Sequence, residues 1–264
     1  TLNTAFVENN QLFLATNQFG VLSSTSLEVI AFSEIHPEGP VSNDVFSVSA
    51  QSNELWIVYG GFGPTYGPIQ RKLGFTHFNG ESWFTAMNDP LNSFPDLVDV
   101  ALDPTNKSKV FISGFGDTMS IDTYNTGGLF EVQNNEITNF YNNLNSPLGD
   151  IVENITNRVT IRVSGSVFDT QGNLWVTNIG VSNELKKFSN GSWSEFNISA
   201  GKPENSFGLS EIVIDRNNTV WIGTRGDGII AFNENGNRIR GLTASPTQGS
   251  LPNIKVESIA VDRD

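Results

Sequence analysis

The chain of 264 residues carries 15 Lys and Arg against 28 Asp and Glu, a formal net charge of −13. This acidity disfavours a nucleic-acid partner, because such a site needs a basic surface. The absence of Cys excludes disulfides, a thiol nucleophile and thiolate metal sites. No apolar run reaches the ~20 residues of a membrane-spanning helix. No charged segment followed by an apolar one marks a signal peptide in this stretch.

One pattern recurs along the chain: an alternating apolar strand, a short polar turn, and a second strand with an aromatic residue near its start. The five aromatic anchors are Phe13, Trp56, Phe111, Trp175 and Trp221. They follow one another at intervals of 43, 55, 64 and 46 residues. Propeller blades of four strands repeat at about 40–45 residues. Two intervals therefore match a blade, and two indicate insertions.

Two further strand candidates follow each copy, and Asn-Gly at 79–80 and 190–191 predicts tight hairpin turns. The sequence therefore predicts an all-β fold, a β-propeller of four-stranded antiparallel blades. The alternative, a β-sandwich, does not require the recurring pattern. About five complete blades are expected, at residues 1–35, 42–87, 96–142, 158–200 and 208–245, with the first strand of a further blade at 253–264.

Five complete blades and the first strand of another do not form a closed ring of complete blades. We expect the chain to be part of a longer protein, in which other segments complete a larger propeller or a pair of propellers. The alternative is a small propeller closed by an exchanged strand.

Insertions at 59–72 and 115–126 both follow the second strand of a blade, so both are expected at the same end of the propeller, together with residues 178–183. A third lengthened segment, 142–160, links two blades. We predict a ligand-binding face there, formed by Tyr59, Tyr66, Arg71, Phe115, Tyr124, Asn178 and Arg225. Lys72 is a further candidate cation on this face. In the alternative interpretation, these long loops are rich in Tyr and Asn by composition alone.

Residues typical of catalysis or metal binding are sparse. The two histidines, His36 and His77, lie in different repeats, and neither has a second His at metal-ligand spacing. The turn at 169–173 lacks the ligand spacing of a calcium loop. The Gly-rich turn at 223–228 is not followed by a helix pattern that would bind phosphate. The expectation is a protein with no catalytic residues, no metal and no cofactor.

The fourth and fifth copies, 169–178 and 215–224, resemble the two-component-regulator propeller repeats of Bacteroidetes sensors. The order of segments over residues 44–233 is similar to that of the PorZ-like surface propellers of the type IX secretion system. It comprises the strand 55–61, the hairpin 74–80 with Trp83, and the segments 103–115, 127–131, 145–148 and 158–178. The resemblance implies an outer-membrane or periplasmic location. It also implies protein partners in an attachment complex and recognition of a lipopolysaccharide glycan.

Three function classes follow. The first is a non-enzymatic recognition and scaffold propeller of a type IX secretion attachment complex at the cell surface. The second is the periplasmic oligosaccharide-sensing propeller of a hybrid two-component sensor. The third is a propeller lyase, which needs a His and a metal near the propeller mouth, and neither histidine falls in a suitable loop. A C-terminal sorting domain would favour the first class, and a membrane span with a kinase would favour the second.

Overall fold

In the computed structural model, nearly all the regular secondary structure is β-strand. The structure describes residues 2–17, 20–24, 26–28, 31–35, 38–87, 96–117, 125–151, 159–204 and 206–262. Within these ranges the one helical segment is a short 3-10 turn, Ser199–Gly201. No helix of the described part is long and apolar enough to cross a membrane. The chain divides into two units, Thr1–Pro40 and Val41–Asp264.

The first unit is one antiparallel sheet in the order β1 (Leu2–Glu8), β2 (Gln11–Thr16), β3 (Gly20–Ser24) and β4 (Phe32–Ile35). Asn9 and Asn10 form the tight turn between its first two strands, with φ of 50° and 65°. Asn tolerates this left-handed region better than most residues. The sheet keeps apolar side chains exposed, including Phe6 at 61% and Phe32 at 40%.

The second unit contains four more four-stranded antiparallel sheets. Their strands are β5 (Ser47–Gln51), β6 (Glu54–Val58), β7 (Phe75–Phe78) and β8 (Trp83–Ala86); β9 (Leu97–Leu102), β10 (Lys109–Gly114), β12 (Gly128–Gln133) and β13 (Glu136–Tyr141); β15 (Val163–Phe168), β16 (Leu174–Asn178), β17 (Leu185–Ser189) and β18 (Ser192–Phe196); and β19 (Leu209–Ile214), β20 (Val220–Thr224), β21 (Ile229–Asn233) and β22 (Arg238–Leu242). A short parallel pair, β11 (Asn125–Thr126) and β14 (Val159–Thr160), joins an insertion to a blade link.

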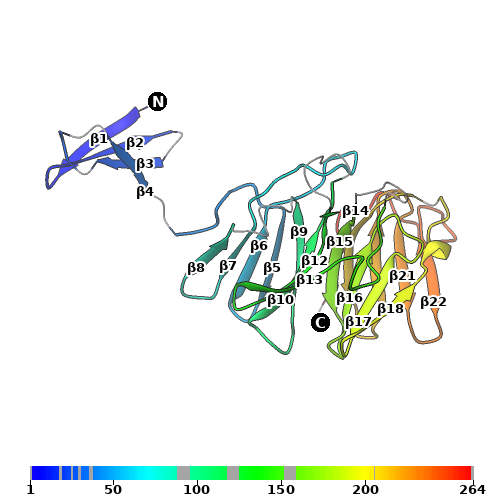
Figure 1. Cartoon of the computed structure of the whole chain (residues 1–264). Helices are drawn as coiled ribbons and strands as arrows, with labels where there is room; N and C mark the ends of the chain where they lie inside the picture. Colours follow the sequence, from blue (N-terminus) through cyan, green and yellow to red (C-terminus); the bar gives the residue numbers. More distant parts are fainter. Residues whose placement is uncertain are drawn as a thin grey trace. The chain divides into compact units, whose positions relative to one another are not determined.

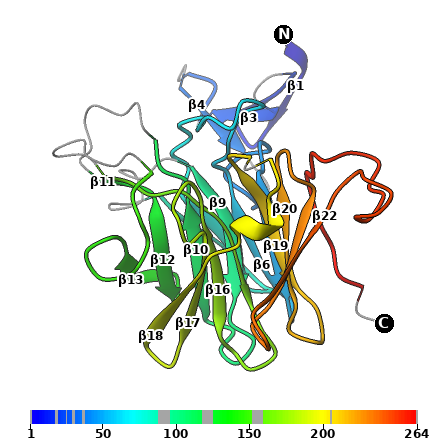
Figure 2. The same ribbon diagram turned by 90° about the vertical axis from the view of Figure 1, so that its right-hand side faces the viewer.

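The four sheets of the second unit are arranged as successive blades (Figures 1 and 2). Their first strands, β5, β9, β15 and β19, neighbour one another in chain order. The later strands of each sheet follow outward in sequence order. This radial arrangement of four-stranded sheets is that of a propeller, which confirms the predicted fold class.

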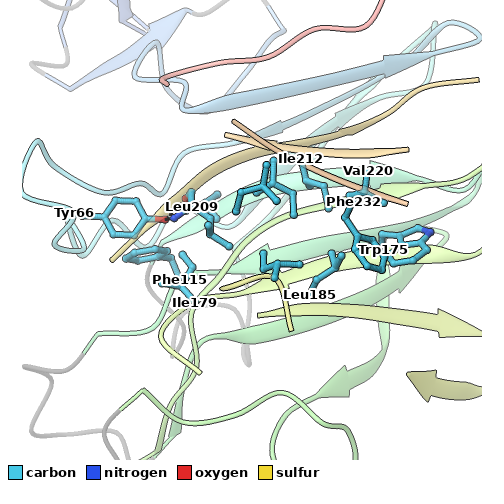
Figure 3. Close-up of a cluster of buried hydrophobic side chains, with 13 residues drawn as sticks. Tyr66, Phe115, Trp175, Ile179, Leu185, Leu209, Ile212, Val220 and Phe232 are labelled. Carbon is cyan, nitrogen blue, oxygen red and sulfur yellow. Dashed lines mark hydrogen bonds between the residues drawn. The ribbon is translucent and has the colours of Figure 1, made fainter. Parts of the chain in front are cut away.

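The aromatic anchors occupy equivalent places on the second strands, as their spacing predicts. In register, Phe13 faces Phe6, Trp56 faces Ser49, Phe111 faces Ala101, Trp175 faces Val167 and Trp221 faces Val213. The Trp175 side chain reaches the next blade, where its ring lies 5.9 Å from Phe232 (Figure 3). Trp56, Phe111 and Trp175 are at most 2% exposed, whereas Phe13 and Trp221 are only half-buried. The three buried anchors, Trp56, Phe111 and Trp175, therefore supply much of the core between blades.

The two predicted Asn-Gly hairpins differ in the length of their connecting loops. Asn190 and Gly191 form a two-residue turn with φ of 49° and 77°, as expected. At the other site Phe78 pairs with Trp83, so the loop has four residues and the predicted two-residue turn at Gly80 is wrong. Gly80 does have positive φ, 93°. The side chain of Asn79 caps this loop by accepting the backbone N–H groups of Glu81 and Ser82, which stabilises the longer connection.

Residues 253–262 contain no assigned strand. Three hydrogen bonds donated by backbone N–H groups connect this segment to the last blade. The Val256 N–H donates to the Thr224 carbonyl at 2.9 Å, and Gly228 N–H donates to Ile254 at 2.7 Å. The Ile259 N–H donates to the Glu211 carboxylate at 2.8 Å. An equivalent bond joins two earlier blades, where Ser166 N–H donates to Asp99 at 2.8 Å. The start of a further blade at this segment stays a prediction.

Candidate functional site

The loops between the second and third strands of the four blades in the second unit meet at one end of that unit (Figure 1). Direct contacts join them. The Tyr66 ring lies 5.1 Å from Phe115 of the next blade. The Arg225 guanidinium of the last blade donates to the Pro64 carbonyl at 3.2 Å. We call this end, formed by the described parts of residues 59–72, 115–126, 178–183 and 225–227, the loop face.

Residues 62–66 form a plug at the centre of the loop face. The loop tightens through Gly63 N–H to Gly67 carbonyl at 2.8 Å and Tyr66 N–H to Gly63 carbonyl at 2.9 Å. From there the Tyr66 side chain reaches the last blade, where its hydroxyl donates to the Leu209 carbonyl and accepts the Leu209 N–H at 3.2 Å (Figure 3). The insertion of the second repeat thus ties its blade to one three blades further along the chain.

Aromatic rings pack the plug into the loop face. The Phe62 ring lies 4.5 Å from Tyr66 and 5.1 Å from Phe115, and 5.2 Å from Phe46. Tyr66 is only 5% exposed, and this burial raises the pKa of its phenol well above the usual range. The phenol is therefore a neutral hydrogen-bonding group here.

Two arginines lie over these rings. The Arg162 guanidinium carbon is 4.6 Å from the centroid of Phe115, and its Nε donates to the Gly116 carbonyl at 3.0 Å. Arg162 is 6% exposed, and desolvation lowers its pKa. Arg225 lies 5.4 Å from Tyr66 and 5.7 Å from Phe62. Cations over aromatic faces stabilise the packing of the plug.

Carboxylates fix the base of the first insertion. Asp96 accepts the backbone N–H groups of Gln70 at 2.7 Å and Arg71 at 3.1 Å. Desolvation raises the pKa of Asp96 to about 6, against the lowering effect of these donors. The Gln70 amide also donates to Asp117 of the second insertion at 2.9 Å. The two insertions are therefore joined by polar bonds as well as by ring contacts.

Most of the predicted ligand-binding residues serve this internal packing. Tyr59 is fully buried, and its hydroxyl donates to Thr76 at 2.7 Å and accepts the Val41 N–H at 3.1 Å. Asn178 is fully buried and accepts the Gly149 N–H at 2.6 Å. Together with the buried Tyr66 and Phe115, these side chains leave no ring face or free amide for a sugar in this structure. The physical reason is that the aromatic groups of an insertion lower their free energy by covering the end of the blade stack.

The predicted cations are also engaged. Arg71 donates to the carbonyls of Asp44 at 2.9 Å and Tyr59 at 3.2 Å, and it stays partly exposed. Arg225 pairs with Glu257 at 3.0 Å. Lys72 is exposed. Tyr124 lies outside the described residues. The loops converge as the sequence predicts, but the side chains chosen as ligand contacts hold the face together.

His77, on strand β7, is a packing residue. It is 7% exposed and stacks on Trp56 with ring centroids 4.0 Å apart. Its Nε2 contacts Glu54 at 2.5 Å, and its Nδ1 contacts Asn135 of the next blade at 2.7 Å. His36 lies outside the described residues. Among those described, no group of three or more His, Cys, Asp or Glu side chains is placed to hold a metal ion.

Sequence reasoning missed Arg162. It also missed a polar cavity between the loop after β16 and the link that leads to β19, lined in part by Glu184 and Lys202. Both charged residues are less than a tenth exposed. A Lys in a link between blades is ordinarily expected to be exposed, so the sequence carries no signal that Lys202 is buried. Nothing in the local pattern says that Glu184 and Lys202 meet.

The fold and the loop face define the chain as part of a β-propeller, and the comparisons with known proteins agree. One similar solved structure is PorZ, a surface component of the type-IX secretion system of Porphyromonas gingivalis. The TM-score is 0.62 and the identity 18%, and the match covers 89% of this chain and 32% of that one. No protein-family model matches the chain, and neither does any curated protein sequence.

Two more similar structures come from B. thetaiotaomicron. The extracellular domain of the putative one component system BT4673 gives a TM-score of 0.55 at 14% identity, covering 99% of this chain and 30% of that one. The extracellular domain of the putative hybrid two component system BT3049 gives 0.52 at 16%, covering 99% and 31%. The chain spans about a third of the length of these structures. The likeness establishes the propeller fold.

Proposed function

We propose that the chain is a non-enzymatic recognition and scaffold propeller of a type IX secretion attachment complex at the bacterial cell surface, with a lipopolysaccharide glycan as its ligand. The observation that carries the proposal is the loop face, whose buried aromatic and amide groups hold the blades together while the partly exposed Arg71 and the exposed Lys72 are left to contact a ligand. A rigid face formed by loops on a strand scaffold suits recognition, because little conformational entropy is lost on binding. The similar fold of PorZ supports the secretion context.

The non-enzymatic role is supported by the engagement of the reactive side chains. His77 is held between Glu54 and Asn135, and Arg225 between Glu257 and Pro64. A lyase requires an imidazole that faces an open site. His77, the histidine within the described residues, has no such exposure, which counts against a lyase site at this residue.

A specific observation favours a second candidate, the periplasmic oligosaccharide-sensing propeller of a two-component sensor. The extracellular domains of BT4673 and BT3049 match 99% of this chain, including the first unit, against 89% for PorZ. Both candidates recognise a carbohydrate. They differ in whether a secretion complex binds as well.

The test uses the full chain. Its binding is measured to purified lipopolysaccharide, to an oligosaccharide array, and to detergent-solubilised outer-membrane complexes of type IX secretion. The variant Arg71→Gln/Lys72→Gln alters the cations at the base of the first insertion. Arg238→Gln/Arg240→Gln on the exposed edge strand β22 is the matched control.

The proposal expects binding of lipopolysaccharide that the first variant weakens and the control retains, together with capture of secretion components. Binding of oligosaccharides alone favours the sensor. Binding of neither a glycan nor a secretion component overturns both candidates.

A further inference from the structure

A cleft of about 400 Å³ lies where the plug meets segment 253–262, which follows the last blade. Its lining combines three apolar side chains, Phe46, Phe62 and Pro64, with three charged side chains, Arg225, Lys255 and Glu257. The volume falls within the range of small-ligand sites. Apolar groups next to charged groups suit a ligand that carries both kinds of chemistry.

The apolar part of the cleft is fixed in shape and open to solvent. Phe46 is 39% exposed, and its ring lies 5.2 Å from the Phe62 ring with the planes at 72°. The Phe46 ring also packs on the backbone of Gly61, where an added Cβ would come within 2.6 Å of it. Pro64 is exposed as well. A ligand that covers these groups removes apolar surface from water without reordering the protein.

The Arg225 guanidinium is held in a fixed position at this cleft. One of its terminal nitrogens donates to the Pro64 carbonyl at 3.2 Å. The guanidinium carbon lies 5.7 Å from the Phe62 ring and 5.4 Å from the Tyr66 ring, and the side chain is 10% exposed. The other terminal nitrogen donates to the Glu257 carboxylate at 3.0 Å. The cation is therefore positioned to bind a carboxylate before any ligand arrives.

Two cations share the Glu257 carboxylate. Its Oε2 lies 3.0 Å from Arg225, and its Oε1 lies 2.6 Å from the ammonium nitrogen of Lys255. Hydrogen bonding to Lys255, together with the charge of Arg225, lowers the pKa of Glu257, so the carboxylate is ionised at neutral pH. The three groups together still carry a net positive charge, in a chain whose net charge is −13.

The carboxylate of Glu257 is also exchangeable. Its side chain is 64% exposed and that of Lys255 is 45% exposed. Ion pairs in contact with solvent contribute little to stability, because water and salt screen them. Another carboxylate can therefore replace Glu257 at a small cost in free energy.

We propose that this cleft binds an apolar monocarboxylate of the size of a single amino-acid residue. This is the chemistry of a peptide C-terminus with an apolar last side chain and of a free aromatic acid. The ligand carboxylate takes the place of Glu257 between Arg225 and Lys255, and the apolar part of the ligand covers Phe46 and Pro64. Glu257 is then an internal competitor that the ligand displaces. This site is independent of the proposed glycan recognition, which involves Arg71 and Lys72.

Calorimetry and ligand-observed NMR measure the binding of small acids to the full chain at low ionic strength, where exposed charges are least screened. The probes are N-acetylphenylalanine, its carboxamide, phenylpropionate and acetate. The carboxamide lacks the charge, and acetate lacks the apolar part. The comparison of these probes therefore separates the two contributions.

The variants are Lys255→Gln, Glu257→Gln and Phe46→Ala. Each has a control with the same substitution at an exposed position elsewhere: Lys107→Gln, Glu136→Gln and Phe84→Ala. The first two controls separate a local effect from the effect of the overall charge. Phe84 is 41% exposed, close to the value for Phe46.

N-acetylphenylalanine and phenylpropionate are expected to bind, and the carboxamide and acetate to bind about tenfold more weakly. Lys255→Gln should weaken the binding of the acids about fivefold, and Phe46→Ala about threefold. Glu257→Gln should strengthen it about fivefold, because the competing carboxylate is removed. The three controls should leave the affinity unchanged. An ion pair that only holds segment 253–262 in place would not make Glu257→Gln strengthen binding.

Tighter binding of N-acetylphenylalanine than of phenylpropionate assigns the site to peptide C-termini, and equal or tighter binding of phenylpropionate assigns it to free aromatic acids. Both results support the proposal. Equal binding of N-acetylphenylalanine and its carboxamide overturns it, as does a Glu257→Gln variant that does not bind the acids more tightly. Absence of binding to both acids also overturns it. Lipopolysaccharide binding through Arg71 and Lys72 is measured separately and does not depend on these outcomes.

Discussion

The Asp169 carboxylate accepts a hydrogen bond from the indole N–H of Trp175 at 3.0 Å, and Asp215 accepts one from Trp221 at the same distance. Each Asp also accepts backbone N–H groups of its own turn, those of Gln171 and Asn173 in the first case. These donors lower the pKa of both carboxyls and outweigh the desolvation that acts against them. The repeated Asp thus fixes the turn and the aromatic anchor at once.

Replacing Asp169 with Ala is expected to destabilise the chain by about 3 kcal/mol, because several charge-assisted hydrogen bonds are lost together. Asp169→Asn keeps one acceptor and should cost about half as much. Urea denaturation measures both. Glu81→Ala, at an exposed hairpin, is the control and should change stability little. Equal stability of Asp169→Ala and the control would show that the turn does not depend on this carboxylate.

The aromatic anchors are expected to differ in how much each contributes to the stability of the chain. Trp175 is 2% exposed and lies between two blades, so Trp175→Ala should cost about 3–5 kcal/mol. Trp221 holds the same register position but is half-buried, so the same substitution should cost roughly half of that. Thermal and urea unfolding of the two variants test the ranking. Equal costs would mean that the two positions are equally packed.

These two tryptophans also show which parts of the structure can be predicted from the sequence. Period-2 alternation and the recurring aromatic predict the strands, the blade positions and the inter-blade core, because each depends on local pattern. The role of Tyr66 was not predictable, because its partner Leu209 lies 143 residues away and no local signal records that contact. The same limit applies to Glu184 and Lys202. Loop aromatics are therefore assigned to ligands or to packing only once long-range contacts are known.

Stability is expected to fall as pH rises from about 4 to about 6. Burial raises the pKa of both Asp96 and Asp99 to about 6, so the folded chain keeps protons that the unfolded chain releases near 4. The contribution of Asp96 and Asp99 to the free energy of unfolding is fully present below about pH 4 and is lost as the pH rises through about 6. Asp99→Asn, which keeps an acceptor for Ser166, should flatten this slope and raise stability at pH 7.

Urea midpoints measured from pH 4 to pH 8 check this slope. The exposed Asp44→Asn provides the comparison and should follow the unmodified chain. A slope that Asp99→Asn leaves unchanged would assign the pH dependence to other groups.

The tight turn at Gly191 gives a purely conformational test. Its φ is 77°, and a Cβ added there would meet nothing within 4 Å. Gly191→Val is therefore expected to destabilise the hairpin through backbone strain alone, by about 1–3 kcal/mol. Gly63→Ala, where φ is not positive and the nearest contact is 3.9 Å, should be close to neutral in the same unfolding measurement. A neutral Gly191→Val would show that the hairpin adopts another turn in solution.

The hydroxyl of Tyr66 is expected to control the closure of the plug. Tyr66→Phe keeps the ring among Phe62 and Phe115 but leaves the buried N–H and carbonyl of Leu209 without this partner. An unsatisfied buried group costs about 1–3 kcal/mol, so the plug should open more often. Hydrogen exchange should then accelerate at the Leu209 amide by about tenfold or more, since 1.4 kcal/mol corresponds to a factor of ten. The amide of Ile222, paired with Ile212 in the same blade, should keep its rate. Acceleration at both amides would indicate loosening of the whole blade, and no change at Leu209 would show that ring packing alone holds the plug.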